Sequence, residues 1–176
     1  LVSVLGTGIR FLDPLEVKNV VMSLNYICDK GADVDDVISK SASKETPAVT
    51  ITQRYQNAFF PATKTIYWNM KASYVVDNST WKVCGRQSAA LALFHELGHF
   101  FHYFTDPNEY DDYCSTKDIQ YDNMEERRTI EQIESPAAKI LGESTRDYHT
   151  DKYGRNLHFD AVSPISTKTK REINKE

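Results

Sequence analysis

Apolar residues recur at helical spacing in an early part of the chain, between Pro14 and Gly31. One helical stripe is made by Val17, Val20, Val21, Leu24, Ile27 and Cys28. Asp13 can cap such a helix, Pro14 suits its first turn, and Gly31 lies just past its end. The pattern therefore predicts an amphipathic helix that covers the core with one face.

The chain then changes to a pattern typical of strands. The stretch 32–47 is polar and rich in serine, and we interpret it as a loop with room for a short helix. Three short runs rich in β-branched and aromatic residues follow, at Ala48–Tyr55, Thr63–Met70 and Ser73–Asp77. Three short strands ahead of a helix predict a small, mostly antiparallel sheet.

Helical spacing returns from Ser88 to Phe104 and stops ahead of Pro107, since the residue before a proline disfavours helix. The polar, acidic stretch 106–122 comes next. It lacks the glycine and the distal glutamate of a calcium-binding loop, so we interpret it as a solvated loop.

Two more helices are predicted after this loop. The first begins in the segment DNMEERRTIEQIE, with Asp122 as its N-cap and Glu125 completing a capping box. The second is short, with Ser135 as its cap and Gly142 past its end.

Length, charge and cysteine content limit the class of protein. The 176 residues favour one domain, which we place at 1–163, and the polar stretch 164–176 is expected to be a flexible tail. A net charge of −4 provides no basic field, so nucleic acid is not an expected partner. No apolar run approaches the roughly 20 residues of a membrane span, so we expect no membrane partner. The three cysteines fit neither a zinc ribbon nor a redox pair.

Two histidines with a glutamate between them interrupt the apolar run LALFHELGHFFHYF. On a helix, His95 and His99 share a face and direct two imidazoles at one point, as a zinc ion requires. Glu96 can reach a water on that metal and act as its general base. Gly98 costs about 1 kcal/mol of helix stability relative to alanine, and a glycine there allows another element to approach closely. This H-E-x-x-H pattern predicts a hydrolytic zinc site.

A catalytic zinc usually takes a third protein ligand. Glu126 shares a helical face with Ile130 and Ile133, and a glutamate beside apolar neighbours requires a partner. Glu125 is accounted for by the capping box, yet it remains the alternative ligand. His102 follows His99 by three residues, but three helical residues over two turns cannot all converge on one ion. We therefore interpret His102 as a supporting residue at the rim.

These motifs resemble those of known families. HELGH followed by EERRT is similar to the light chains of the botulinum and tetanus neurotoxins, zinc proteases whose second glutamate of the pair is a ligand; this implies Glu126. The longer pattern TIYWN, ALFHELGHFFH, EERRTIEQIE and LGESTRDYH resembles the NleD-type bacterial effector metallopeptidases, over roughly Thr65 to His149. Such domains occur as injected effectors and as tips of Rhs-type toxins, and a chain that begins at Leu1 suits an excised tip.

The resemblance also implies an arginine and a proton donor. In the neurotoxins an arginine and a tyrosine after the zinc glutamate stabilise negative charge on the substrate. Here STRDYH offers Arg146, with Tyr148 and His149 as alternatives for the donor. The competing interpretation of Arg146 is a surface ion pair with Asp147 or Glu143.

Together these features predict an α+β, zincin-like metallopeptidase whose small sheet packs on the H-E-x-x-H helix. We expect a secreted or translocated zinc endopeptidase toxin or effector that cleaves a protein in the target-cell cytoplasm. A cognate immunity protein or a carrier toxin is a further expected partner. The TIYWN strand is expected to form a sheet edge that holds an extended substrate by strand addition.

Two alternatives stay open. One is a zinc hydrolase of a non-protein amide, such as a cell-wall peptide. The other is a non-catalytic, zinc-stabilised binding module. In that module His102 or Cys114 would supply a fourth ligand, and Glu96 would be dispensable.

Overall fold

The computed structural model describes residues 9–10, 14–43, 48–150 and 156–175. Asp13, the predicted cap of the first helix, lies outside the described residues. The helical elements are α1 (Pro14–Asp29), η2 (Val34–Asp36), α2 (Val37–Ser41), η3 (Pro61–Thr63), α3 (Ala89–Thr105), α4 (Pro107–Ser115), α5 (Met124–Thr129), η4 (Ile130–Glu134), α6 (Ser135–Leu141) and α7 (Lys170–Ile173). The strands are β1 (Ile9–Arg10), β2 (Val49–Gln53), β3 (Ala58–Phe60), β4 (Thr65–Trp68), β5 (Ala72–Val76), β6 (Val83–Gln87), β7 (Lys117–Asp118), β8 (Asp122–Asn123) and β9 (His158–Phe159).

The fold is α+β, as predicted, but the strands are arranged differently from the prediction. A four-stranded sheet has the order β1-β2-β4-β3, in which β1, β2 and β4 run parallel and only β3 is antiparallel to its neighbour. β5 belongs to a separate antiparallel sheet with the order β6-β5-β9. The prediction of one mostly antiparallel sheet is therefore wrong. The reason is β3, which lies between β2 and β4 in the chain. The chain reverses direction into β3 and again into β4, so β2 and β4 run parallel.

β3 also changes which strand lies at the sheet edge. The TIYWN strand, β4, is flanked by β2 on one side and by β3 on the other. The expectation that this strand forms an edge is wrong. Among the described residues, β3 takes that place at this end of the sheet.

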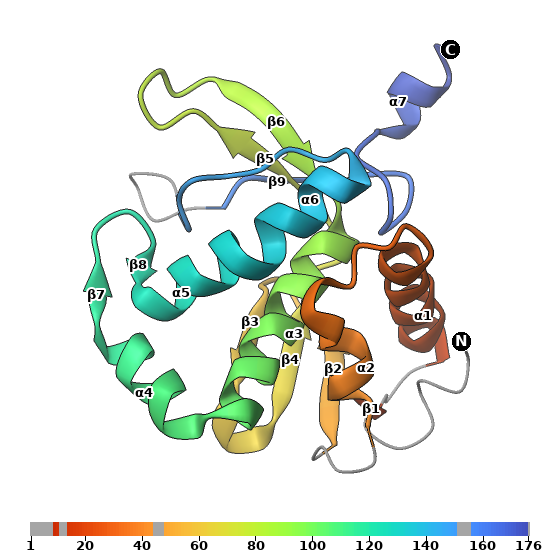
Figure 1. Cartoon of the computed structure of the whole chain (residues 1–176). Coiled ribbons are helices and arrows are strands. Elements are labelled where there is room, and N and C mark those ends of the chain that lie inside the picture. The colour runs from red at the N-terminus through yellow and green to blue at the C-terminus, as the bar shows by residue number, and fades with distance from the viewer. Residues whose placement is uncertain (1–8, 11–13, 44–47, 151–155, 176) are drawn as a thin grey trace.

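α3 runs through the middle of the molecule, in front of the four-stranded sheet, with α1 and α2 on one side and the α5–α6 segment crossing it on the other (Figure 1). Its predicted extent is confirmed within a residue, and Ser88 caps it by accepting a hydrogen bond from the Leu91 backbone at 3.2 Å. The helix is buried along most of its length because apolar side chains surround it. Those of Leu91, Phe94, Leu97 and Phe100 belong to the main core.

Gly98 lies where the next helical segment crosses α3. A Cβ atom at this position would lie 2.9 Å from Ile133 Cδ1 and 3.0 Å from Thr129 Cγ2. Both distances are below ordinary carbon contact. The prediction that this glycine allows close approach of another element is confirmed, and that element is the α5–η4 segment.

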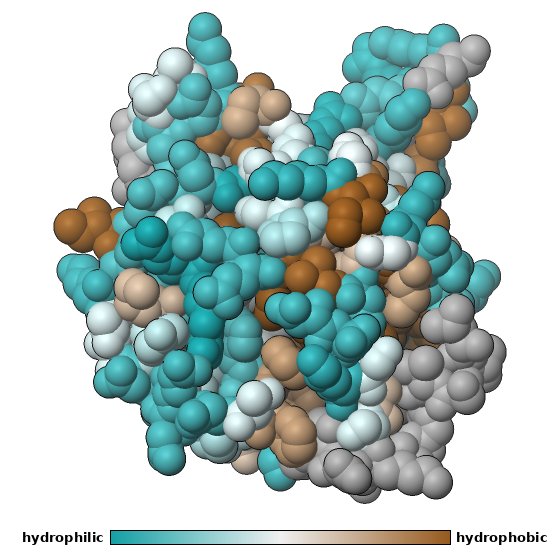
Figure 2. Space-filling model, viewed as in Figure 1, coloured by the Kyte–Doolittle hydropathy of each residue, from teal (hydrophilic) through white to brown (hydrophobic). Residues whose placement is uncertain are grey.

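The stretch 106–122 contains a helix, α4, so its interpretation as a loop is wrong. Asp106 caps α4 by accepting from the Asn108 and Glu109 backbones, and Pro107 fits the first turn. The buried Tyr110 anchors the helix, with its ring 6.3 Å from that of Phe59. Hydrophilic side chains predominate on the outer surface of this region (Figure 2).

The α5–α6 segment starts one residue later than predicted. Asn123, and not Asp122, caps α5 by accepting from the Glu126 backbone at 2.9 Å, so the expected capping box with Glu125 does not form. The chain then continues through the π-helical η4 into α6 without a new cap at Ser135. Gly142 ends α6 in a left-handed conformation with φ 72°, as predicted.

The C-terminal stretch differs from the flexible tail expected over 164–176. The Ala90 backbone donates to the Pro164 carbonyl at 2.9 Å, and Thr169 and Glu172 form a capping box at α7. Glu172 also pairs with Arg86 on β6 at 2.8 Å. Over the described helices as a whole, none combines the length and apolarity required to cross a membrane.

Candidate metal centre

α3 brings His95 and His99 to one point, as their four-residue spacing predicts. The two Nε2 atoms lie 3.0 Å apart, and the two residues are only 3% and 5% exposed. Buried imidazoles need polar partners, because water cannot satisfy them there. Those partners come from α5, from η4 and from the chain between α6 and β9.

Glu126 on α5 completes a triangle of ligand atoms. Its Oε2 lies 3.2 Å from His95 Nε2 and 3.3 Å from His99 Nε2, and this buried oxygen has no hydrogen-bond partner among the described residues. Burial raises the pKa of Glu126, but His99 and His95 outweigh it and hold this pKa well below its usual value. Ligand atoms of a tetrahedral zinc, at bond lengths of 2.0–2.1 Å, lie roughly 3.3 Å apart. The size of the triangle and its ionised, unpartnered oxygen therefore fit a divalent metal ion.

Glu125, the alternative ligand, lies on the other side of the histidines. Its Oε1 is 3.0 Å from His99 Nδ1 and 2.8 Å from His102 Nδ1, and Arg128 donates to its second oxygen at 3.0 Å. One of the arguments for Glu126 over Glu125 is that Glu125 acts as a capping residue. That argument was wrong, since Glu125 is buried against histidines and caps nothing. His102 is engaged by Glu125 and does not join the ligand triangle.

Glu134 is a residue of this site that the sequence analysis missed. It is 1% exposed and lies at the end of η4, with its Oε2 2.9 Å from His95 Nδ1, although the angle is outside normal hydrogen-bond geometry. Gln87 donates to its Oε1 at 2.7 Å. The signal that pointed to Glu134 is its position four residues after the buried Ile130, because a carboxylate on an apolar helical face requires a partner.

Arg146 is held by Glu134. Its Nε donates to Oε1 at 2.8 Å and its Nη2 to Oε2 at 2.6 Å, while Nη1 donates to the His149 carbonyl at 2.8 Å. Burial raises the pKa of Glu134, but Arg146 and His95 outweigh it and lower this pKa below its usual value. The surface ion pair with Asp147 or Glu143 is not the arrangement found. Arg146 instead joins the carboxylate behind His95 to the backbone at His149.

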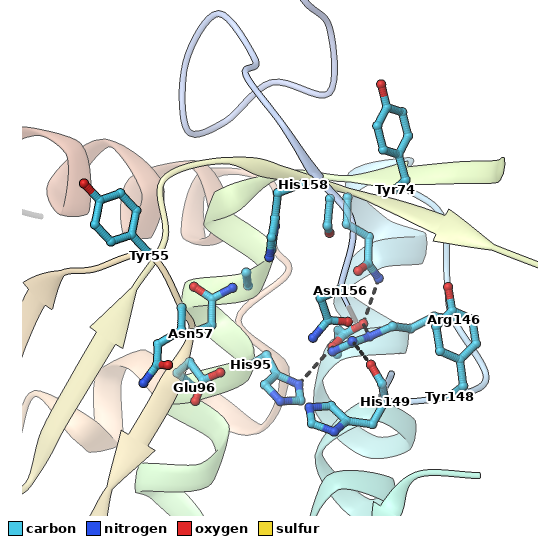
Figure 3. A pocket seen from close by; sticks show the side chains of 15 residues that line it. Tyr55, Asn57, Tyr74, His95, Glu96, Arg146, Tyr148, His149, Asn156 and His158 are labelled. Carbon is cyan, nitrogen blue, oxygen red and sulfur yellow. Dashed lines mark hydrogen bonds and ion pairs between the residues drawn. The ribbon is translucent and has the colours of Figure 1, made fainter. Parts of the chain in front are cut away.

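Tyr148 and His149, the alternatives for proton transfer, face different surroundings. The Tyr148 hydroxyl accepts a hydrogen bond from the Val76 backbone at 2.6 Å and is directed toward β5. The His149 ring lies beside that of His95, with centroids 6.3 Å apart and planes nearly parallel (Figure 3). His149 Nε2 is 3.5 Å from Glu126 Oε2, and His149 Nδ1 is 2.6 Å from Asp122 Oδ2. Only His149 of these two directs an atom toward the ligand triangle.

Glu96 lies beside the triangle without being part of it. It is 5% exposed, and burial raises the pKa of its carboxyl group. It lines a cavity of about 270 Å³ together with His95, Arg146 and His149. A raised pKa allows a carboxylate to take up and return a proton closer to neutral pH.

Three other parts of the chain also line this cavity. Tyr55 and Asn57 precede β3, Tyr74 lies on β5, and Asn156 and His158 lie in and before β9 (Figure 3). These side chains are polar or amphipathic and carry no formal negative charge. The cavity therefore adjoins the histidines with hydrogen-bonding groups on its opposite side.

Among the described residues, the ligand atoms of His95, Glu126 and His149 lie within 4.8 Å of one another. His99 Nε2 adds a fourth atom through the distances given above. His102 and Cys114, the fourth ligands of the non-catalytic alternative, are not part of this group. Comparison of the chain with protein-family models, with curated proteins and with solved structures finds no match.

Proposed function

We propose that this protein is a zinc-dependent endopeptidase. The observation that carries the proposal is the triangle of His95 Nε2, His99 Nε2 and Glu126 Oε2, with sides of 3.0, 3.2 and 3.3 Å. Two imidazoles and one glutamate are a donor set that hydrolytic zinc sites use. The buried Glu96 stands on the same helix and faces the adjoining cavity.

In this proposal His95, His99 and Glu126 hold the zinc ion. When bound, zinc supplies Lewis-acid polarisation of a carbonyl oxygen and lowers the pKa of a water. Glu96 takes a proton from the attacking water and returns it to the departing amine. Its raised pKa, which results from burial, suits both transfers.

The carboxylates behind the histidines are positioning residues. A histidine ligand that donates its second ring nitrogen to a carboxylate is fixed in tautomer and orientation. Glu125 does this for His99 at 3.0 Å, and Glu134 contacts the corresponding atom of His95 at 2.9 Å. Both rings are thereby held with Nε2 toward Glu126.

Arg146 acts in two ways in this proposal. Three of its five N–H donors are engaged by Glu134 and the His149 carbonyl, so it is first a positioning residue. In this proposal the other two donate to negative charge that develops on a substrate oxygen in the cavity that Arg146 lines. For proton transfer beside Glu96 we favour His149 over Tyr148, since the Tyr148 hydroxyl is engaged at the Val76 backbone.

The wider setting rests on the motif resemblance alone. We propose a zincin-like member of the NleD-type effector metallopeptidases, secreted or translocated, that acts on a protein in the cytoplasm of a target cell. A cognate immunity protein or a carrier toxin would belong to the same setting.

The test compares the wild-type protein with Glu96→Gln and with Glu131→Gln, a control at an exposed glutamate. Zinc content, unfolding and cleavage of casein and of target-cell lysate proteins are measured, with new N-termini identified by mass spectrometry. We expect about one zinc in all three, and turnover 10²–10⁴-fold lower in Glu96→Gln only, the usual size of a lost general base.

Other outcomes separate the alternatives. Equal behaviour of Glu96→Gln and the wild type, with zinc retained, would favour a binding module. Cleavage of cell-wall peptides but of no protein would favour the amide hydrolase. Absence of zinc in the wild type, even after its addition, would overturn the proposal.

A further inference from the structure

Three histidines around Glu126 share one arrangement of neighbours. The sequence motifs account for only two of these histidines as metal ligands. Each has its Nδ1 on a carboxylate: His95 on Glu134 at 2.9 Å, His99 on Glu125 at 3.0 Å and His149 on Asp122 at 2.6 Å. A carboxylate can only accept, so the Nδ1 atoms of His99 and His149 carry a hydrogen, whereas the contact of His95 Nδ1 lies outside normal hydrogen-bond geometry. In the neutral ring, Nε2 is then left as a lone pair.

The Nε2 atoms of all three rings face the same oxygen. Glu126 Oε2 lies 3.2 Å from Nε2 of His95, 3.3 Å from that of His99 and 3.5 Å from that of His149. This oxygen is buried and, within the part of the chain that the structure describes, has no hydrogen-bond partner. Three imidazole nitrogens and one carboxylate oxygen that converge within 3.5 Å are a set of ligand atoms that suits a divalent metal ion. His149 takes part in this arrangement on the same terms as the two motif histidines.

We propose that His149 is a fourth protein ligand of the metal in the free protein, and that substrate displaces it. The proposal rests on the proposed function for the identity of the metal site. It goes beyond that function, because the H-E-x-x-H motif and the third glutamate account for three ligands only.

The surroundings of His149 suit a ligand that binds the metal reversibly. The side chains of His95 and His99 are 4% and 6% exposed, and their carboxylate partners are 2% and 1% exposed. The His149 side chain is 25% exposed, and its partner Asp122 is 51% exposed. A partly solvated ring outside the helices loses less by turning away than a ring packed inside α3.

The backbone at His149 is anchored even though its side chain is not buried. Arg146 donates to the His149 carbonyl at 2.8 Å, and the His149 amide donates to the Gln120 carbonyl at 3.3 Å. Displacement therefore involves rotation of the side chain rather than movement of the loop. The ring would turn toward the cavity that it lines with Glu96.

A catalytic zinc keeps one position open for water or substrate. With His149 in that position, the metal of the free protein has no position open to substrate. Access then requires a group able to compete with an imidazole, such as a substrate carbonyl held by the cavity walls or an anionic metal-binding group.

The experiment uses the apoprotein reconstituted with Co²⁺, whose visible absorption reports the ligands directly. The variants are His149→Ala and, as control, His158→Ala, a histidine of the same cavity that no contact joins to Glu126. Without substrate, we expect the Co²⁺ spectrum to change in His149→Ala alone. We also expect its metal affinity to fall by at least the 10–100-fold that loss of an outer-shell partner costs. Acetohydroxamate should bind the His149→Ala site more tightly than the wild type, since no imidazole has to leave.

Identical spectra, metal affinities and hydroxamate affinities in His149→Ala and the wild type would overturn the inference. Asp122→Asn, which keeps the His149 ring but weakens its anchor, provides a second variant if His149→Ala does not fold; an unchanged spectrum there would also count against it. If the inference about His149 fails in this way, normal metal binding by the wild type and an inactive Glu96→Gln variant would still support the proposed function. Absence of metal binding by the wild type would end both.

Discussion

α4 and the α5–η4 segment are near neighbours in the chain, and both carry several acidic residues, yet their carboxylates have opposite surroundings. On α4, Glu109, Asp111 and Asp112 are exposed to solvent. On α5–η4, Glu125 and Glu134 are each 1% exposed. The comparison teaches that acidic character predicts neither solvation nor function until the packing of the helix is known.

The difference follows from which element each segment contacts. α4 is anchored by the buried Tyr110, so Asp111 and Asp112 remain in water, while the exposed Glu109 pairs with Arg128 at 2.6 Å. The α5–η4 segment crosses α3 at Gly98 and carries its carboxylates to the histidines. A buried carboxylate is tolerated when charges and hydrogen bonds compensate for the lost water.

Removal of Glu134 should have the largest effect on stability. Glu134→Ala leaves Arg146, His95 and Gln87 without their shared acceptor, and breaking a buried ion pair costs about 3–5 kcal/mol. Urea unfolding measures the loss. The control Glu131→Ala, in the same segment, removes only an exposed pair with Arg127 and should cost about 0.3–0.5 kcal/mol. Similar losses in the two variants would contradict the contrast between buried and exposed acids.

Removal of each of the two adjacent glutamates of α5 should lower the zinc affinity by a different amount. Glu126→Ala removes the oxygen that faces three histidines and should weaken zinc binding by more than 100-fold, beyond the 10–100-fold of an outer-shell partner. Glu125→Ala should fall inside that range, because it only loosens the His99 ring. Competition with a chromogenic chelator measures both. A larger loss in Glu125→Ala would mean that the ligand is misassigned.

The crossing of α3 by α5–η4 can be tested through Gly98. Gly98→Ala gains about 1 kcal/mol of helix propensity. The new methyl group would, however, lie 2.9 Å from Ile133 Cδ1 and 3.0 Å from Thr129 Cγ2. Overpacking of this kind costs about 1–3 kcal/mol, so we expect a net loss in thermal unfolding, partly recovered in Gly98→Ala with Ile133→Val. A more stable Gly98→Ala protein would show that the crossing is looser than described.

The exposed acids of α4 should give the smallest effect. Asp111→Asn changes a solvated carboxylate, and surface substitutions of this type stay within about 0.5 kcal/mol. Zinc affinity should match the wild type in the same chelator assay. A change in either quantity would mean that α4 contributes to the site through its charge.

The sequence predicts the position and the site residues of α3 better than those of the α5–η4 segment that crosses it. Periodicity and a serine cap locate α3, and the four-residue spacing places His95 and His99 together, since both are local properties of a helix. The Glu126 oxygen does lie at the histidines, whereas the supporting argument that Glu125 is a capping residue is wrong. Local rules were sufficient for α3 because its histidines belong to one element.

The sheets show the limit of such rules. β2 and β4 were recognised as strands by their composition, but their parallel pairing depends on β3, which reverses the chain between them. β5 lies in a separate sheet, although its composition is as typical of a strand as that of β2 and β4. Strand pairing joins distant residues, and propensity contains no information on which strands meet.

The sequence by itself determined the α+β class, the extent of α3, the shared face of His95 and His99, and the room for close approach of another element at Gly98. Each of these follows from spacing within one helix or from the size of one side chain. Only the tertiary structure decided that Glu134 and Arg146 stand behind His95, and that Asp122 directs His149 toward Glu126. These contacts join residues from separate elements, whose approach depends on how the whole core packs rather than on any local pattern.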